Sequence, residues 1–432
     1  MLAVLHMGVF DRGLGGDGWA TFAFLESAVE DHDLFLENNS HGVTNGLLPG
    51  PGGHLVMQYP PGAVLLDLAP FLAGRAADAL LPQRWLASGA VVPPAGRVPR
   101  RVFLEVAAIV AARNLEVLAG LAAILLALRR AGFPDGVAAA ATALVFFGGP
   151  LVFYSLVGAT HAPTFALAAV LLLVLVGNGA EDGTRRAFVA GALVGAATLV
   201  RYSAVALLPA ALLGIGMLAP GRRRGATVAG FLLPLVLLPP YWRVHYGQWA
   251  PMGYGGSLQP TLASPWNVLL SGHHGLFVFH PALALAVGGL ALVWFGAAGA
   301  RPRRLGLLAF VWLGSVALLH GWWSEWANPG GYGQRFLIDA LPALAVGFAG
   351  LLAVRRGRAV VATALAATVL FGYLLFFTAV AGLARSSAGM PWPQTLADFA
   401  SLLHDPPDAR EAGRGLLRAS FSLRVLLGSP AG

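Results

Sequence analysis

The stretch AAIVAARNLEVLAGLAAILLALRR, residues 107–130, decides the class of fold. Residues 107–128 are mostly apolar over a length that crosses the roughly 30 Å hydrocarbon core of a bilayer, and an arginine pair follows. Similar runs recur along the chain, which is 57% hydrophobic and 11% charged, with a mean hydropathy of +0.70. Soluble domains do not have this composition. The sequence therefore predicts an all-α, multi-pass transmembrane protein.

The positive charge of the chain comes from arginine alone, because the sequence has no lysine. A formal net charge of +8 would suit a nucleic-acid partner in a soluble protein. Here the arginines gather between apolar runs, which is typical of membrane orientation, so we expect a lipid bilayer and no nucleic acid as partner. The absence of cysteine excludes disulfides, thiolate metal sites and a cysteine nucleophile.

Five arginine clusters set the predicted topology. They are Arg129-Arg130, Arg185-Arg186, Arg222-Arg223-Arg224, Arg301/Arg303/Arg304 and Arg355-Arg356/Arg358. If all of them lie in the cytoplasm, an even number of crossings must separate each neighbouring pair. Each gap does hold two apolar segments: 137–157 and 160–177, 187–200 and 203–218, 227–242 and 280–298, 305–321 and 336–354. One parity fits every gap, which favours cytoplasmic clusters throughout.

The rest of the topology follows from this parity. Residues 107–128 enter from outside, so residues 11–106 form a large extracytoplasmic loop with surface helices. The last span, about 359–382, leaves an extracytoplasmic tail over 384–432. We expect about 10–11 membrane segments in one domain, 1–383, in the plasma (inner) membrane with the active site facing outside the cytoplasm.

Three segments depart from a simple span. The pair within 187–218 is too short for two full crossings, so its turn LVRYSAV should lie within the membrane or a cavity. Residues 1–10 are apolar but too short to span, so the first helix is either truncated at this start or only dips into the membrane. Pro60-Pro61 should start a helix at the membrane surface.

Carboxylates gather in the first loop. The stretch 15–39, GGDGWATFAFLESAVEDHDLFLENN, holds six of the chain's 20 acidic residues. Asp17 has two interpretations: an N-cap for a helix that begins at Gly18, or a general base that takes a proton from an acceptor hydroxyl. Asp31 and Asp33 resemble a metal-binding pair, but two carboxylates and one histidine favour a solvated helix end, so we expect no metal.

Two residues with polar side chains lie at outer helix ends. Arg201 stands in an apolar hairpin away from every arginine cluster. It needs a partner or a wet cavity, and the alternatives are snorkelling to the outer headgroups or binding a phosphate. His161, in GATHAP, is more often a hydrogen-bonded structural histidine.

The second dense extracytoplasmic stretch is GWWSEWANPGGYGQRFLIDALP, residues 321–342. Its tryptophans suit an interfacial belt. The loop 328–333 is rich in glycine and would expose backbone N–H groups, and Arg335 follows it as a bidentate donor for a phosphate. Glu325 is the alternative, purely structural partner of Arg335.

These stretches, together with YPPGAVLLDLAPFLAG, AARNLEVLAGLAAILLALRR, YWRVHYGQWAPMGYG and SPWNVLLSGHHGLFVFHPALAL, occur in a familiar order. In that order they resemble bacterial family-39-like glycosyltransferases of the GT-C fold, which are related to protein O-mannosyltransferases and the lipid A aminoarabinose transferase. The resemblance covers roughly residues 15–355.

The resemblance implies transfer of a sugar from a polyprenyl-phosphate donor to a lipid, glycan or protein acceptor, with inversion at the anomeric carbon. It gives the role of base to Asp17 and places Arg335 and Arg201 at the donor phosphate and Tyr59 at the cavity entrance. Glu26, His161 and Tyr332 complete the predicted substrate-binding set. No cofactor is expected. Gly18 stands where the family often has a second acid, which puts a metal or an acidic partner in doubt.

Two other functions compete with this one. A transporter or flippase of lipid-linked sugars would use Arg201 as a substrate contact, but transporters tend to show internal repeats and lack an acidic outer loop of this length. An inactive structural membrane subunit is the third interpretation. An assay separates the first two functions: a transferase moves the sugar onto an acceptor, whereas a flippase moves the unaltered sugar-lipid to the other leaflet.

Overall fold

The computed structural model describes most of the chain. The described residues are 14–40, 46–80, 102–156, 160–177, 183–216, 221–252, 258–261, 264–272, 274–296, 303–327, 333–354 and 358–380. The predicted tail 384–432 and the predicted site residue Tyr332 lie outside these residues.

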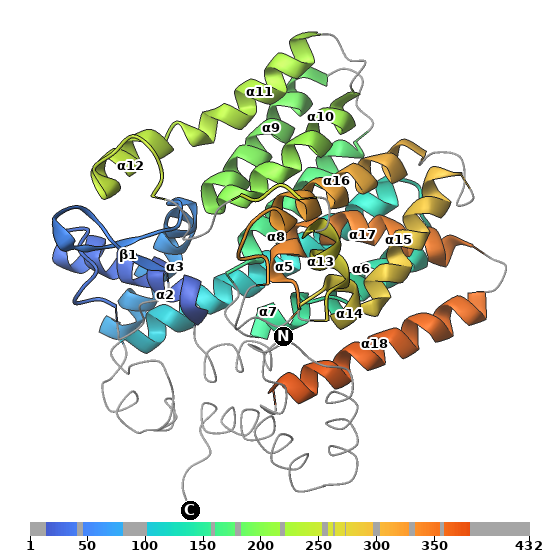
Figure 1. The fold of residues 1–432 in the computed structure, drawn as a ribbon, viewed down its shortest axis with the longest axis horizontal. Helices are drawn as coiled ribbons and strands as arrows, with labels where there is room; N and C mark the ends of the chain where they lie inside the picture. The colour runs from blue at the N-terminus through green and yellow to red at the C-terminus, as the bar shows by residue number, and fades with distance from the viewer. Residues whose placement is uncertain are drawn as a thin grey trace, which may run out of the picture.

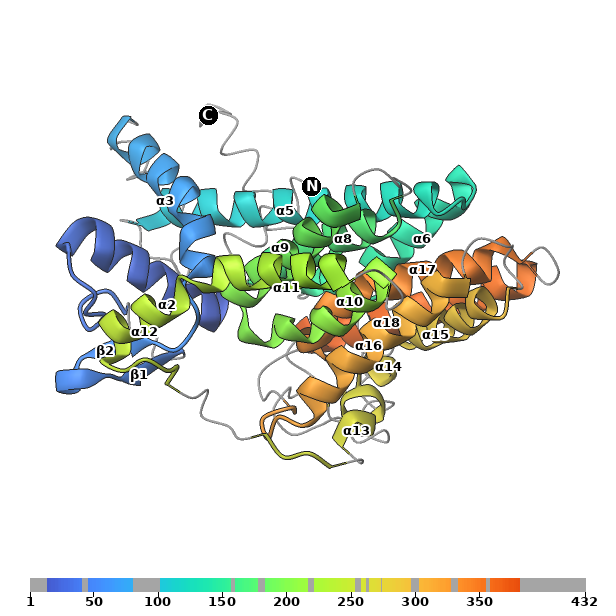
Figure 2. The same cartoon turned by 90° about the horizontal axis from the view of Figure 1, so that it is seen from above.

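The described chain is a helical bundle with a smaller unit at one end (Figures 1 and 2). The bundle helices are α5 (Phe103–Arg130), α6 (Asp135–Phe147), α7 (Leu151–Leu156), α8 (Ala162–Leu175), α9 (Gly183–Val200), α10 (Leu208–Gly216), α11 (Gly221–Leu235), α13 (Ser264–Leu270), α14 (Leu276–Phe279), α15 (Pro281–Trp294), α16 (Arg303–Gly321), α17 (Leu341–Ala353) and α18 (Arg358–Val380). The 3₁₀ turns η5 (Tyr202–Leu207) and η6 (Arg335–Ala340) lead into α10 and α17.

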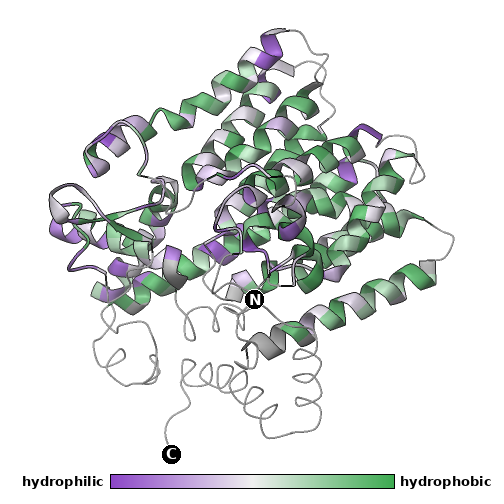
Figure 3. Ribbon diagram, in the orientation of Figure 1, coloured by the Kyte–Doolittle hydropathy of each residue, from purple (hydrophilic) through white to green (hydrophobic). Residues whose placement is uncertain are grey.

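The multi-pass helical prediction is confirmed. Four helical stretches among the described residues are long and apolar enough to cross a membrane: Leu104–Arg130, Gly221–Tyr246, Arg303–Gly321 and Arg335–Ala353. Shorter apolar helices accompany them at Asp135–Phe147, Ala162–Leu175, Tyr202–Ile215, Pro281–Trp294 and Ala359–Tyr373. Each apolar segment that the arginine parity requires contains a helix, and Figure 3 shows these helices as mainly hydrophobic.

The smaller unit is built from the predicted extracytoplasmic loop. It contains α2 (Gly15–Glu26), the π-helical turn η2 (Ser27–Asp31), strand β1 (Leu47–Pro49), the 3₁₀ turn η3 (Pro51–Gly53), strand β2 (Leu55–Met57) and α3 (Gly62–Leu80). Helix α3 begins directly after Pro60-Pro61, as predicted. The antiparallel hairpin β1–β2, with Leu47 opposite Met57, was not predicted from the sequence, which around these two short strands is rich in glycine and proline.

Helix α12 (Leu238–Tyr246) continues the chain from α11 and packs against this hairpin. The Tyr246 hydroxyl donates to the Met57 carbonyl over 2.8 Å, and the Met57 N–H donates to His245 Nε2 over 2.9 Å. The Tyr241 hydroxyl donates to the Tyr59 carbonyl over 2.9 Å. These hydrogen bonds connect α12, the continuation of α11, to the segment that carries Tyr59.

Glycine contacts show which bundle helices run parallel. Gly191 and Gly195 of α9 lie against Thr227 and Phe231 of α11, in the same order along both helices. Gly289 of α15 lies against Gly347 of α17, and Val293 against Gly350, again in the same order. The arginine parity predicts these two pairs to be parallel, and the structure bears out these relative directions. Small residues permit such close approach between membrane helices.

We expect Gly289→Ala to lower stability and Gly288→Ala to leave it unchanged or raise it. A Cβ on Gly289 would lie 1.9 Å from the Gly347 carbonyl oxygen, whereas one on Gly288 would meet nothing within 4 Å. Overpacking costs about 1–3 kcal/mol, and alanine in an open helix position gains up to about 1 kcal/mol over glycine. Thermal unfolding of both variants in one detergent measures the difference. Equal melting temperatures would contradict the close contact of α15 and α17.

Candidate functional site

Asp17 lies where four separate parts of the chain meet. Its Oδ1 accepts a hydrogen bond from the Tyr59 hydroxyl over 2.8 Å. Its Oδ2 lies 3.6 Å from Nη2 of Arg201 and 3.9 Å from Nη2 of Arg335. The side chain of Asp17 is only 12% exposed. The structure thus brings together the predicted base and both predicted phosphate-binding arginines.

The position of Asp17 in its helix excludes the N-cap interpretation. Helix α2 begins at Gly15, with Leu14 as the N-cap residue, so Asp17 stands inside the first turn. Its carboxylate binds side chains of other elements and does not cap α2. The adjacent Gly18 allows α2 to approach the chain before α8, because a Cβ there would lie 3.1 Å from the Thr160 methyl group.

Arg201 is directed into the site by a break between two helical segments. Helix α9 ends at Val200, Arg201 is extended (φ −150°, ψ 117°), and η5 begins at Tyr202. Nη1 of Arg201 donates to Nδ1 of His161 over 2.8 Å, while its Nη2 faces Asp17. The snorkelling interpretation is therefore wrong, since the guanidinium is held between two buried side chains and is 14% exposed.

The contact with Arg201 fixes the protonation state of His161. A guanidinium has only donors, so Nδ1 must accept and the proton of the neutral ring lies on Nε2. His161 is 1% exposed, and Nε2 has no hydrogen-bond partner among the described residues. His161 therefore orients Arg201 and does not line the cavity that Asp17 faces.

Arg335 opens η6, one residue before the aromatic ring that both arginines share. The centroid of Phe336 lies 5.2 Å from Cζ of Arg335 and 5.8 Å from Cζ of Arg201, within the range of cation–π attraction. Nε of Arg335 is buried without a hydrogen-bond partner in the described part of the chain. Donors are thus available on Arg335 for an anionic ligand.

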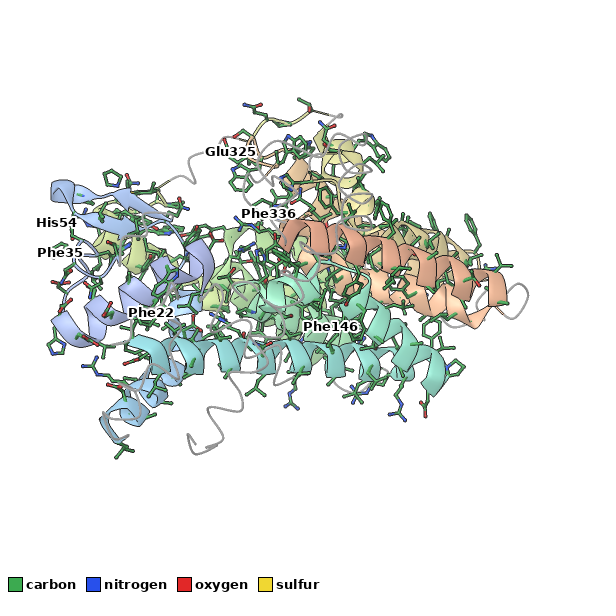
Figure 4. The ribbon with its side chains drawn as sticks, turned by 90° about the horizontal axis from the view of Figure 1, so that it is seen from below. Phe22, Phe35, His54, Phe146, Glu325 and Phe336 are labelled. Carbon is green, nitrogen blue, oxygen red and sulfur yellow. The ribbon has the colours of Figure 1, made fainter. Side chains whose placement is uncertain are left out.

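The alternative partner of Arg335 is excluded by its contacts. Among the described residues, the carboxylate within 4 Å of Arg335 belongs to Asp17 and not to Glu325. Glu325 lies in the turn that follows α16, and its side chain is labelled in Figure 4 together with Phe336, the neighbour of Arg335.

The electrostatic surroundings keep Asp17 ionised. Burial raises the pKa of its carboxyl, but the guanidinium groups of Arg335 and Arg201 and the Tyr59 hydrogen bond together lower it below the ordinary value. Burial and the neighbouring carboxylate raise the pKa of Tyr59, so its hydroxyl stays protonated and donates. At neutral pH the site holds a carboxylate and a neutral phenol.

A small cavity opens beside Asp17. Its volume is about 40 Å³, enough to hold ordered water. Asp17, Tyr59 and Arg201 line it, as do Asp67 of α3 and Arg113 of α5. Nη2 of Arg113 lies 2.6 Å from Oδ2 of Asp67, and both residues are 4% exposed.

The other predicted site residues do not gather here. Glu26 is nine residues from Asp17 on α2, about 13 Å along the helix axis, and does not line the cavity. Oδ1 of Asp33 accepts from the Ser27 hydroxyl and the Phe35 N–H, and Asp31 accepts from Asn38. These two acids shape their loop, and among the described residues no cluster with metal-ligand composition is present.

Sequence inspection missed three buried charged residues near the site. Asp67 and Arg113 stand within apolar stretches that were interpreted only as helices, LLDLAPF and AARNLEV. Asp339 of η6 is 3% exposed and lies near Arg201 and Thr164. A charge inside an apolar run was the available signal, and it was applied to Arg201 alone.

No family model matches the chain, and no curated protein matches it. The chain is similar to the crystal structure of ArnT from Cupriavidus metallidurans in the apo state, with 15% sequence identity and a TM-score of 0.46. The similarity covers 97% of this chain and 71% of that chain.

Proposed function

We propose that the protein is a membrane glycosyltransferase that moves a sugar from a polyprenyl-phosphate donor to an acceptor hydroxyl at the extracytoplasmic face. The observation that carries the proposal is the position of Asp17 between Arg201 and Arg335, beside a cavity at the end of an apolar bundle. The two guanidinium groups offer donors for a phosphate, and the carboxylate offers an acceptor for a proton.

The reaction needs no covalent enzyme intermediate. The acceptor oxygen attacks the anomeric carbon, and its proton passes to the Asp17 carboxylate. The bond between that carbon and the phosphate oxygen breaks, and polyprenyl phosphate leaves with both electrons. Arg201 and Arg335 would stabilise the charge that develops on the leaving phosphate. Attack opposite the leaving group inverts the anomeric carbon.

The arginines that bind the donor also control the base. In the free protein they lower the pKa of Asp17, which makes its carboxylate a weak proton acceptor. A donor phosphate would compete with Asp17 for the same guanidinium groups and bring a second negative charge close to it. Both effects raise the pKa of Asp17, so the base would strengthen when the donor is bound.

This coupling gives a pH prediction. The acidic limb of kcat/KM reports the free protein and should lie below the ordinary range of an aspartate, because the pKa of Asp17 is lowered there. The acidic limb of kcat reports the complex and should lie at higher pH. Initial rates between about pH 3 and 8 would measure both limbs. Coinciding limbs would contradict the competition between phosphate and Asp17.

Proteoliposomes with a radiolabelled lipid-linked sugar test the function itself. Label transferred to an acceptor supports the transferase, whereas intact sugar-lipid that changes leaflet supports the flippase. The Asp17→Asn variant serves as the matched control, because flipping needs no proton acceptor. Flipping without transfer in the parent protein would overturn the proposal.

The predicted orientation has its own test. The native chain has no cysteine, so a single introduced cysteine reports its side of the membrane without background. Asn38→Cys in the first loop should react with an impermeant thiol reagent in sealed cells, and Gly221→Cys at the start of α11 should not. Both positions are exposed. Labelling of Gly221→Cys would reverse the orientation and place the site in the cytoplasm.

A further inference from the structure

A second pair of opposite charges lies in the wall of the cavity that Asp17 faces. Asp67 and Arg113 form an ion pair over 2.6 Å, and both line this cavity. Nη1 of Arg113 also binds Glu116 over 3.1 Å, but Glu116 does not line the cavity. One guanidinium thus has a carboxylate partner inside the cavity and another outside it.

A buried ion pair at this position is a poor source of folding stability, so its presence favours a role in ligand binding. Removing two charges from water generally costs more than their attraction returns, and well-packed apolar residues often stabilise a fold equally well. Burial raises the pKa of Asp67 to about 6, although Arg113 lowers it. The attraction to Arg113 therefore does not fully offset the cost of burying this carboxylate. Arg113 lies in α5, which is long and apolar enough to span the membrane, and a charged residue in such a helix indicates a functional site.

The charged groups that line the cavity restrict the chemical class of ligand that it can bind. Asp17, Arg201, Asp67 and Arg113 all line the cavity, so two carboxylate acceptors and two guanidinium donors share its wall. An anionic sugar would meet two carboxylates, and a cationic one would meet two guanidinium groups. Neighbouring hydroxyl groups of an uncharged sugar match both, because each hydroxyl donates to a carboxylate and accepts from a guanidinium.

We infer that Asp67 and Arg113 bind the hydroxyl groups of the transferred sugar and select an uncharged, polyhydroxylated one. This inference rests on the proposed function, which assigns the phosphate of the donor to Arg201 and Arg335. Hydroxyl groups of the sugar would then reach into this cavity in place of ordered water, with the anomeric carbon toward Asp17. Asp67 and Arg113 act on the sugar, and Arg335 acts on the phosphate.

Binding of two lipids separates these roles. The probes are polyprenyl phosphate and polyprenyl-phosphate mannose or glucose, measured on the full chain in detergent. The parent should bind a sugar-bearing lipid more tightly than the bare lipid. Asp67→Asn should weaken binding of the sugar-bearing lipid by about 10- to 100-fold and leave binding of the bare lipid nearly unchanged. Arg335→Lys should weaken binding of both lipids.

Two further variants control for folding. Glu116→Gln removes a partner of the same arginine outside the cavity, so it should keep the preference for the sugar-bearing lipid. If Asp67→Asn does not fold, Ala63→Leu replaces it. Ala63 lines the cavity one helical turn before Asp67, and a larger side chain there would fill the sugar space without breaking the ion pair.

Each outcome decides one question. A parent that binds neither lipid overturns the proposed function, and the sugar site with it. A parent that binds both lipids equally, for mannose and glucose alike, overturns the sugar site alone. An unchanged preference in folded Asp67→Asn or in Ala63→Leu overturns it too. Loss of the preference in these variants, with its retention in Glu116→Gln, supports the assignment.

Discussion

Asp17→Asn is expected to lower sugar transfer at saturating donor by roughly 10² to 10⁴, the usual contribution of a positioned general base. The amide keeps the size of the side chain and can still accept the Tyr59 hydrogen bond, but it cannot take the acceptor's proton. Asp17 lies between two guanidinium groups, so the change also leaves two partly buried cations with fewer anionic partners. Some loss of stability should therefore accompany the loss of activity.

The control must separate these two effects. Melting temperature in detergent reports folding, and the donor KM reports binding. Asp31→Asn is the matched variant, because it removes an exposed acid of the same loop that accepts a hydrogen bond from Asn38 and does not contact Asp17. It should retain activity near that of the parent. Normal turnover in folded Asp17→Asn would assign the base to another residue.

Arg335→Lys is expected to raise the donor KM by roughly 5- to 150-fold, which corresponds to about 1–3 kcal/mol. Lysine keeps the charge but loses the planar fork that binds two phosphate oxygens at once. The buried Nε of Arg335, which has no partner among the described residues, is one of the donors that lysine cannot supply. Initial rates at varied donor and fixed acceptor measure the effect, and kcat should change less.

Arg243→Lys is the matched control for this substitution. Arg243 also lies near an aromatic ring, with Cζ 6.0 Å from the centroid of Trp249, and it donates to the Gly247 carbonyl. It is exposed on α12 and does not contact Asp17. Its variant should leave the donor KM within about twofold of the parent. An unchanged KM in Arg335→Lys would remove this residue from the donor site.

Local patterns in the sequence were sufficient to predict the membrane helices and their relative directions. A span needs only a long apolar run, and its direction depends on the arginines beside it, so both are visible in contiguous residues. The parallel pairs α9 with α11 and α15 with α17 agree with this parity. Asp17 was identified in the acidic first loop, Arg201 by its place in an apolar hairpin and Arg335 by the glycine-rich loop before it, and the family resemblance gave each its role.

Tertiary structure alone decided how those residues meet. Asp17 and Arg335 are more than 300 positions apart in the chain, and no local pattern specifies a contact over that separation. Close packing at Gly18 of α2 and Gly62 of α3 brings the first loop against the chain before α8 and the end of α9, and the hydroxyl of Tyr241 holds the segment that carries Tyr59. The pairing of Asp67 with Arg113 could not be predicted for the same reason. Each is visible in the sequence as a charge inside an apolar run, but only the packing of α3 on α5 shows that the two charges form an ion pair and share a cavity with Asp17.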